Sequence, residues 1–122
     1  MDYASSRAVE SQKMAGVRFS VRKMSFGRRM ELMRRVRELA RRAEFLAAGE
    51  SAGERMDAAL ARAEIDRLYV TWGLEAIAGL RIDGAEATPE ALAEAGPEEL
   101  FREALVLVRR ETGLDEAERK NC

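Results

Sequence analysis

The chain has 122 residues, of which 35% are charged and 47% are hydrophobic, and its formal net charge is −1. This length suits one domain built around a single core. Histidine is absent and Cys122 is the only cysteine, so the commonest general base and metal ligand is missing and no disulfide can form within the chain. Phosphate-binding and dinucleotide-binding glycine motifs are also absent. The sequence therefore predicts a protein that is not an enzyme, with no catalytic, cofactor-binding or metal-binding residues.

Charge is divided unevenly along the chain. Residues 1–47 carry a net charge of +7, and residues 48–122 carry a net charge of −8. A basic segment can bind a nucleic acid or an acidic protein, and oppositely charged halves can attract each other within one molecule or between copies. The arginines are not interleaved with aromatic residues, and no helix-turn-helix spacing is evident. These features favour a protein partner over a nucleic acid and leave self-association open.

The sequence contains no segment typical of a membrane or secreted protein. No apolar run approaches the roughly 20 residues that a helix needs to span a bilayer. The N-terminal residues lack the apolar core of a secretory signal. A single cysteine is consistent with a reducing compartment, so we expect a cytoplasmic protein without membrane partners.

The N-terminal part is predicted to contain a tail and then one strand. Residues 1–15 are small and polar without periodicity, which predicts a flexible tail ahead of a single α-helical domain over residues 16–122. Apolar residues alternate with polar and basic ones over residues 17–23. This alternation predicts a short, half-buried strand whose polar face is basic.

Two long helices should follow the strand. The first begins after Ser25, a suitable N-cap residue, and continues to about Ala48, with apolar residues every three or four positions along one face. Most of its arginines lie elsewhere on the helix. The second helix should run from about Glu54 to Trp72, and Gly73 can end it.

Aromatic residues are scarce, which draws attention to Tyr69 and to Trp72, the only tryptophan. Two large aromatic side chains close together can form a ligand site. Here, however, they continue the apolar stripe of the second helix at helical spacing. This spacing favours a place in the core.

The last third of the chain should contain a hairpin and two further helices. Asp83-Gly84 is a frequent hairpin turn, and each helix is predicted from a proline near its start and a glycine after its end. Residues 74–82 could continue the second helix or form a strand, and a hairpin of residues 78–82 with 85–87 is favoured. The other predicted elements are helices over 89–95 and 97–112 and a final turn at 115–120. The predicted fold class is therefore mainly α, a small bundle of about four helices with a short N-terminal strand and a short hairpin.

Residues 17–23 and 25–47 are predicted to form a partner-binding surface, supported by a core from residues 54–113. Exposed methionines adapt to varied apolar partners, although methionines more often fill gaps in a core. Arginines around them would hold acidic residues of a partner and limit self-aggregation. The predicted partner-binding residues are Arg22, Met30, Met33, Arg34, Val36, Arg37 and Arg41.

Two stretches together resemble the small tail assembly chaperones of long-tailed bacteriophages and prophages. Val17–Ala40 carries the predicted strand followed by SFGRR. Leu68–Asn121 carries, in order, WGL, GLRIDG, GPE, a closing GL and ERKN. The likeness covers about two thirds of the chain, and none of its motifs is catalytic.

This resemblance implies a non-enzymatic role in virion assembly. Such chaperones bind the long, helical tape measure protein, keep its apolar surface in solution, and help to recruit the tail tube protein. The resemblance also implies a location in the cytoplasm of the bacterial host and absence from the mature virion. Two alternatives remain open: a small basic regulator associated with nucleic acid, and a structural tail component that is retained in the virion.

Overall fold

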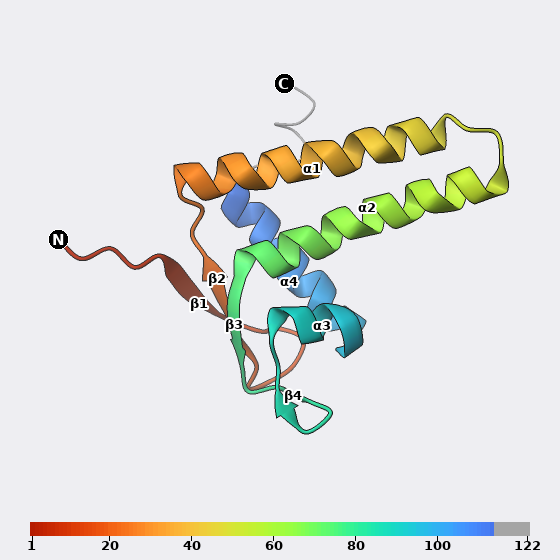
Figure 1. Cartoon of the computed structure of the whole chain (residues 1–122). Helices are drawn as coiled ribbons and strands as arrows, with labels where there is room; N and C mark the ends of the chain where they lie inside the picture. Colours follow the sequence, from red (N-terminus) through yellow and green to blue (C-terminus); the bar gives the residue numbers. More distant parts are fainter. Residues whose placement is uncertain (114–122) are drawn as a thin grey trace.

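The computed structural model describes residues 1–113, which form four helices and five strands (Figure 1). In chain order these are β1 (Ser6–Glu10), β2 (Arg18–Arg22), α1 (Phe26–Ala47), α2 (Ala52–Gly73), β3 (Leu74–Ala78), β4 (Arg81–Ile82), β5 (Ala85–Glu86), α3 (Pro89–Ala95) and α4 (Glu98–Thr112). The prediction of a mainly α protein with strands is confirmed. The predicted final turn at 115–120 lies outside the described residues.

The N-terminal segment differs from the predicted flexible tail. Ser6–Glu10 forms β1, which pairs antiparallel with β2 so that Arg7 lies opposite Val21 and Val9 lies opposite Phe19. The sequence SRAVE has no run of residues that favour strands. Its strand conformation comes from pairing with β2, because strand preference depends strongly on the neighbouring strand.

The sheet has three antiparallel strands in the order β1-β2-β3. The strand predicted from alternation is the central one, β2, and the inward-facing Phe19 and Val21 are fully buried. Strand β3 starts directly after the last residue of α2, in the stretch 74–82 that the sequence left open between helix and strand. A change of register between β2 and β3 leaves Glu75 without an opposite residue, which is the pattern of a β-bulge.

The predicted hairpin is present but shorter than expected. Asp83 and Gly84 both have positive φ, 50° and 82°, as a two-residue type I′ turn requires. Only β4 and β5, of two residues each, pair across this turn. Ala78, predicted to start the hairpin, instead ends β3.

Helices α1 and α2 form an antiparallel pair whose far ends project beyond α4 (Figure 1). Each helix has 22 residues, or about 33 Å at 1.5 Å per residue. Both begin at a serine N-cap, with Ser25 Oγ accepting from the N–H of Arg28 and Ser51 Oγ accepting from the N–H of Glu54. The Ser25 cap and the start of α1 are therefore as predicted.

The core lies where the inner face of the sheet meets α2, α3 and α4, and α1 adds Leu32 to it. The largest fully buried side chains are Phe19, Leu32, Leu92, Leu100, Val21, Val70, Val108 and Thr112. Tyr69 is only 3% exposed and belongs to the core, and Trp72 is partly buried against it. The predicted place in the core is confirmed for Tyr69, and Trp72 packs at the edge of the core. No helix within residues 1–113 is both long enough and apolar enough to cross a lipid bilayer.

Trp72 also fixes the start of α1 to the end of α2. The guanidinium carbons of Arg28 and Arg35 lie 4.5 Å and 4.6 Å from the centroid of its ring, within range of cation–π attraction. Arg28 Nη2 donates to the backbone carbonyl of Trp72 at 2.8 Å. Burial of its guanidinium, and secondly the nearby charge of Arg22, lower the pKa of Arg28 from its usual value.

The ionisation of Glu75 makes the stability of the fold depend on pH in the acidic range. Hydrogen bonds from the hydroxyls of Ser6 and Ser20, together with the charge of Arg22, lower the pKa of Glu75 from its usual value. Ionised Glu75 therefore stabilises the fold above the unfolded-state pKa of about 4.3, and this contribution is lost as the pH falls through the folded-state pKa.

We expect the difference in unfolding free energy between the wild type and Glu75→Gln to be constant from neutral pH down to about pH 5 and to shrink below about pH 4. Urea unfolding at stepped pH values measures this difference. Glu86→Gln, which removes an exposed carboxylate from the hairpin, is the matched control. A Glu75→Gln difference that grows toward acid pH would contradict the prediction.

Candidate partner-binding site

Helix α1 is covered by the protein on one side and exposed on the other. Its buried residues, Leu32 and Ala43, face α2, which is the main packing partner of α1. On the opposite side Phe26, Met30 and Met33 are 83%, 47% and 43% exposed. Their spacing of four and three residues places them in one row along the helix. The exposed row and the arginines beside it form what we call the α1 outer face: Phe26, Met30, Met33, Arg34, Arg37 and Arg41.

The structure places five of the seven predicted partner-binding residues on this face and two outside it. Val36 is turned toward the protein, where it is partly buried and packs against the core. Arg22 lies on β2 opposite Ser6, on the solvent side of the sheet. The other side of β2 contributes to the core, as expected for the half-buried strand predicted there.

Phe26 belongs to this exposed row but is absent from the residues predicted from the sequence. It is the first residue of α1, directly after the Ser25 cap, and more exposed than either methionine. Its position four residues before Met30 and seven before Met33 is the signal that would have identified it.

The arginines of the α1 outer face differ in their partners. Arg34 and the neighbouring Arg35 both pair with Glu31 on the same helix. Arg37 and Arg41 form no ion pair with any residue in the described range 1–113. Exposed ion pairs of the Glu31 type contribute less than about 1 kcal/mol. The cations of this face are therefore available to carboxylates of another molecule.

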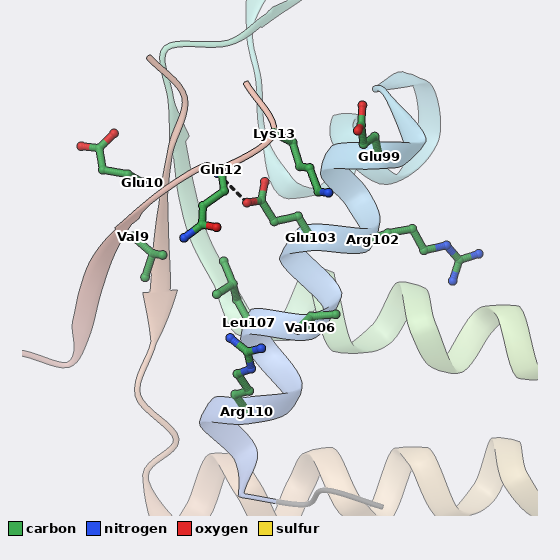
Figure 2. Close-up of a pocket in the computed structure, with 10 residues that line it drawn as sticks. All are labelled: Val9, Glu10, Gln12, Lys13, Glu99, Arg102, Glu103, Val106, Leu107 and Arg110. Carbon is green, nitrogen blue, oxygen red and sulfur yellow. Dashed lines mark hydrogen bonds between the residues drawn. The ribbon is translucent and has the colours of Figure 1, made fainter. Parts of the chain in front are cut away.

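A groove of about 600 Å³ lies elsewhere, between α4 and the β1–β2 turn (Figure 2). Val9, Val106 and Leu107 supply the apolar part of its lining. The polar part comes both from α4 and from β1 with the β1–β2 turn. The lining residues are Val9, Glu10, Gln12, Lys13, Glu99, Arg102, Glu103, Val106, Leu107 and Arg110.

Glu103 holds the β1–β2 turn against α4 and so shapes this groove. Its carboxylate accepts a hydrogen bond from the hydroxyl of Ser11 at 2.6 Å and one from the backbone N–H of Gln12 at 2.7 Å. The Ser11 Oγ in turn accepts from the N–H groups of Lys13 and Met14. The turn is thus ordered by a charged acceptor that lies more than ninety residues away in the sequence.

The described residues offer two surfaces to a binding partner, the α1 outer face and the groove beside α4. No group of three or more histidine, cysteine, aspartate or glutamate side chains within residues 1–113 is arranged to hold a metal ion. The α1 outer face combines a row of large apolar side chains with cations, and the groove is lined by both apolar and charged side chains. Comparisons of the chain with protein-family models, curated proteins and solved structures find no match.

Proposed function

We propose that the protein is a tail assembly chaperone of a long-tailed bacteriophage or prophage, which binds the tape measure protein through the α1 outer face and helps to recruit tail tube subunits. Two observations support the proposal. One is the resemblance of Val17–Ala40 and Leu68–Asn121 to such chaperones. The other, which carries the assignment of the surface, is the exposed row of Phe26, Met30 and Met33. Large apolar side chains gathered on one exposed face are typical of a protein contact.

The shape of the face suits a helical client. A helix laid along α1 would bring apolar residues at three- and four-residue spacing against the row, as in other helix-in-groove contacts. Unbranched methionines at Met30 and Met33 can adjust to varied client residues. Acidic client residues would meet Arg37 and Arg41. Because the far end of α1 projects beyond α4 (Figure 1), a long client could lie along the α1 outer face without disturbing the core.

Reversing three charges on this face tests the proposal. We expect Arg34→Glu/Arg37→Glu/Arg41→Glu to reduce co-purification of the coexpressed tape measure protein by about tenfold or more, since like charges brought together at an interface are strongly unfavourable. All three side chains are exposed, so the melting temperature should change by no more than a few degrees.

The matched control is a second triple variant with the same change in charge. Arg55, Arg62 and Arg81 are exposed residues of α2 and β4, outside the α1 outer face, and replacing all three by glutamate should leave co-purification unchanged. Equal co-purification by the two triple variants would contradict the proposal.

A DNA mobility shift that weakens steeply with salt would favour the nucleic-acid alternative. Detection of the protein in purified virions by mass spectrometry would favour a retained structural component.

A further inference from the structure

Strand β1 is an edge strand, and within residues 1–113 it pairs only with β2. Hydrogen bonds at its two ends show which residues face β2. The N–H of Lys23 donates to the carbonyl of Ser5 at 2.8 Å, and the N–H of Ser11 donates to the carbonyl of Val17 at 2.8 Å. The register between these two pairs is continuous.

This register identifies the backbone groups that remain open. Residues of an antiparallel strand alternate between those that bond to the neighbour and those that face away. Since Ser5 and Ser11 bond to β2, so do the odd-numbered Arg7 and Val9. The N–H and carbonyl groups of Ser6, Ala8 and Glu10 therefore point to the open edge.

The charged side chains of β1 do not guard this edge. Edge strands are commonly protected by charged residues or proline. Arg7 instead pairs with Glu111 of α4 at 3.3 Å, and Glu10 pairs with Arg18 of β2 at 2.6 Å. Both charges are thus engaged with the protein itself, which leaves the backbone of the strand open to another chain.

The groove provides room for side chains of an added strand. Val9 lies opposite the buried Phe19, so it is on the face of the sheet that meets α4. Figure 2 shows Val9 and the β1–β2 turn on one side of the groove and Val106, with Arg110, on the α4 side. Val106 is 48% exposed and can accept an apolar side chain.

The two ends of the groove differ in charge: Arg110 lies at one end, and the other end carries both signs, with Lys13 beside Glu99 and Glu103 (Figure 2). Glu99 lies in the first turn of α4 and Arg110 in its last turn, and neither forms an ion pair within the part of the chain that the structure describes. Arg7 near the start of β1 contacts Glu111 near the end of α4, and Ser11 after β1 contacts Glu103 further back. Helix α4 and β1 therefore run in opposite directions.

We propose that β1 and the adjoining groove bind an extended peptide segment of a partner protein, added antiparallel to β1, with an apolar side chain over Val106 and carboxylates at its C-terminal end near Arg110. Strand addition supplies affinity through main-chain hydrogen bonds and specificity through alternate side chains. Antiparallel addition places the acidic side chains at the C-terminal end of the segment beside Arg110, which forms no ion pair within residues 1–113. The site shares no residue with the α1 outer face, so it does not rest on the proposed function.

A synthetic peptide tests this site. The probe is a fluorescein-labelled eight-residue peptide with lysine first, alternating valine and threonine in the middle, and two aspartates last, measured by fluorescence anisotropy. We expect saturable binding that Ala8→Pro weakens roughly tenfold, because proline removes an N–H of the open edge and leaves the pairing with β2 in place. Circular dichroism checks that the variant is folded. Arg110→Glu should also weaken binding, whereas Arg62→Glu should not.

Changes in the peptide give a second test that does not depend on the stability of any variant. Two peptides carry methyl groups on alternate backbone nitrogens, offset from each other by one residue. In one peptide the methyl groups lie on the edge that faces β1 and block pairing, and in the other they face solvent. Only the second peptide should bind. Equal binding by both, or by the wild type and Ala8→Pro, would overturn the proposal. A dimer in sedimentation that Ala8→Pro dissociates would also overturn it, because the edge would then pair with a second copy of β1. The triple arginine variant of α1 should bind the peptide normally, which separates this test from that of the proposed function.

Discussion

Replacing Gly79 by alanine is expected to lower the free energy of unfolding by roughly 2–5 kcal/mol, through backbone strain and steric overlap together. Gly79 has a φ of 80°, a left-handed conformation that costs other L-residues about 1–2 kcal/mol. An alanine Cβ at this position would also overlap the backbone carbonyl oxygen of Gly16 and lie 3.0 Å from its carbonyl carbon. Because a backbone atom cannot rotate away as a side chain can, the end of β3 or the β1–β2 turn would have to shift.

Thermal and urea unfolding measure this loss, which should lower the melting temperature by roughly 8–20 °C for a chain of this size. Gly84→Ala is the matched control, since Gly84 has a φ of 82° but no atom lies within 4 Å of the position that its Cβ would take. The control should cost only the conformational part, about 1–2 kcal/mol. Equal losses for the two variants would show that the approach of Gly79 to Gly16 is not tight.

Gly73→Ala is the second large effect that we expect, with a loss of about 1–3 kcal/mol from overpacking. Gly73 is the last residue of α2 and is buried against α4. An added Cβ would overlap the Val108 side chain, with its Cβ 3.1 Å away and both γ-carbons closer. Val108 is fully buried, and a β-branched side chain in a helix has one strongly preferred rotamer, so it cannot move aside easily.

A double-mutant cycle identifies this overlap as the cause. Val108→Ala alone should cost about 2 kcal/mol, because it removes buried methyl groups and leaves a cavity. In Gly73→Ala/Val108→Ala the new methyl group occupies part of that space, and the double variant should be more stable than the sum of the two single losses predicts, by about 0.5–3 kcal/mol. Simple additivity in urea unfolding would show that the two residues are not in contact.

The helices could be predicted from the sequence because their ends carry local signals. Ser25 and Thr88 each accept a hydrogen bond from an N–H of the first turn, and Gly113 adopts the left-handed conformation after α4. Such caps involve residues only three or four positions apart, so they depend little on the rest of the fold. The Asp83-Gly84 turn is local in the same sense.

The sheet could be predicted only in part. Strand β2 shows alternation because one face is buried against the core and the other faces solvent. Strands β1 and β3 lack this pattern, and they are strands because β2 offers both of its edges for pairing. The turn after β1 is held by Glu103, whose partner Gln12 is 91 positions away, and no sequence pattern signals a contact of that range.

Periodicity and contacts a few residues apart were enough to predict the helices, the central strand and the hairpin turn. They also place five of the candidate residues on one helix: Met30, Met33, Arg34, Arg37 and Arg41. The packing of the elements against one another sets which side of α1 is exposed. It turns Val36 inward, leaves Phe26 outward, and sets β1 beside α4 to form the groove. The physical reason is that burial and strand pairing depend on residues far apart in the chain, whose meeting is fixed by how the elements pack rather than by the order of residues within any one of them.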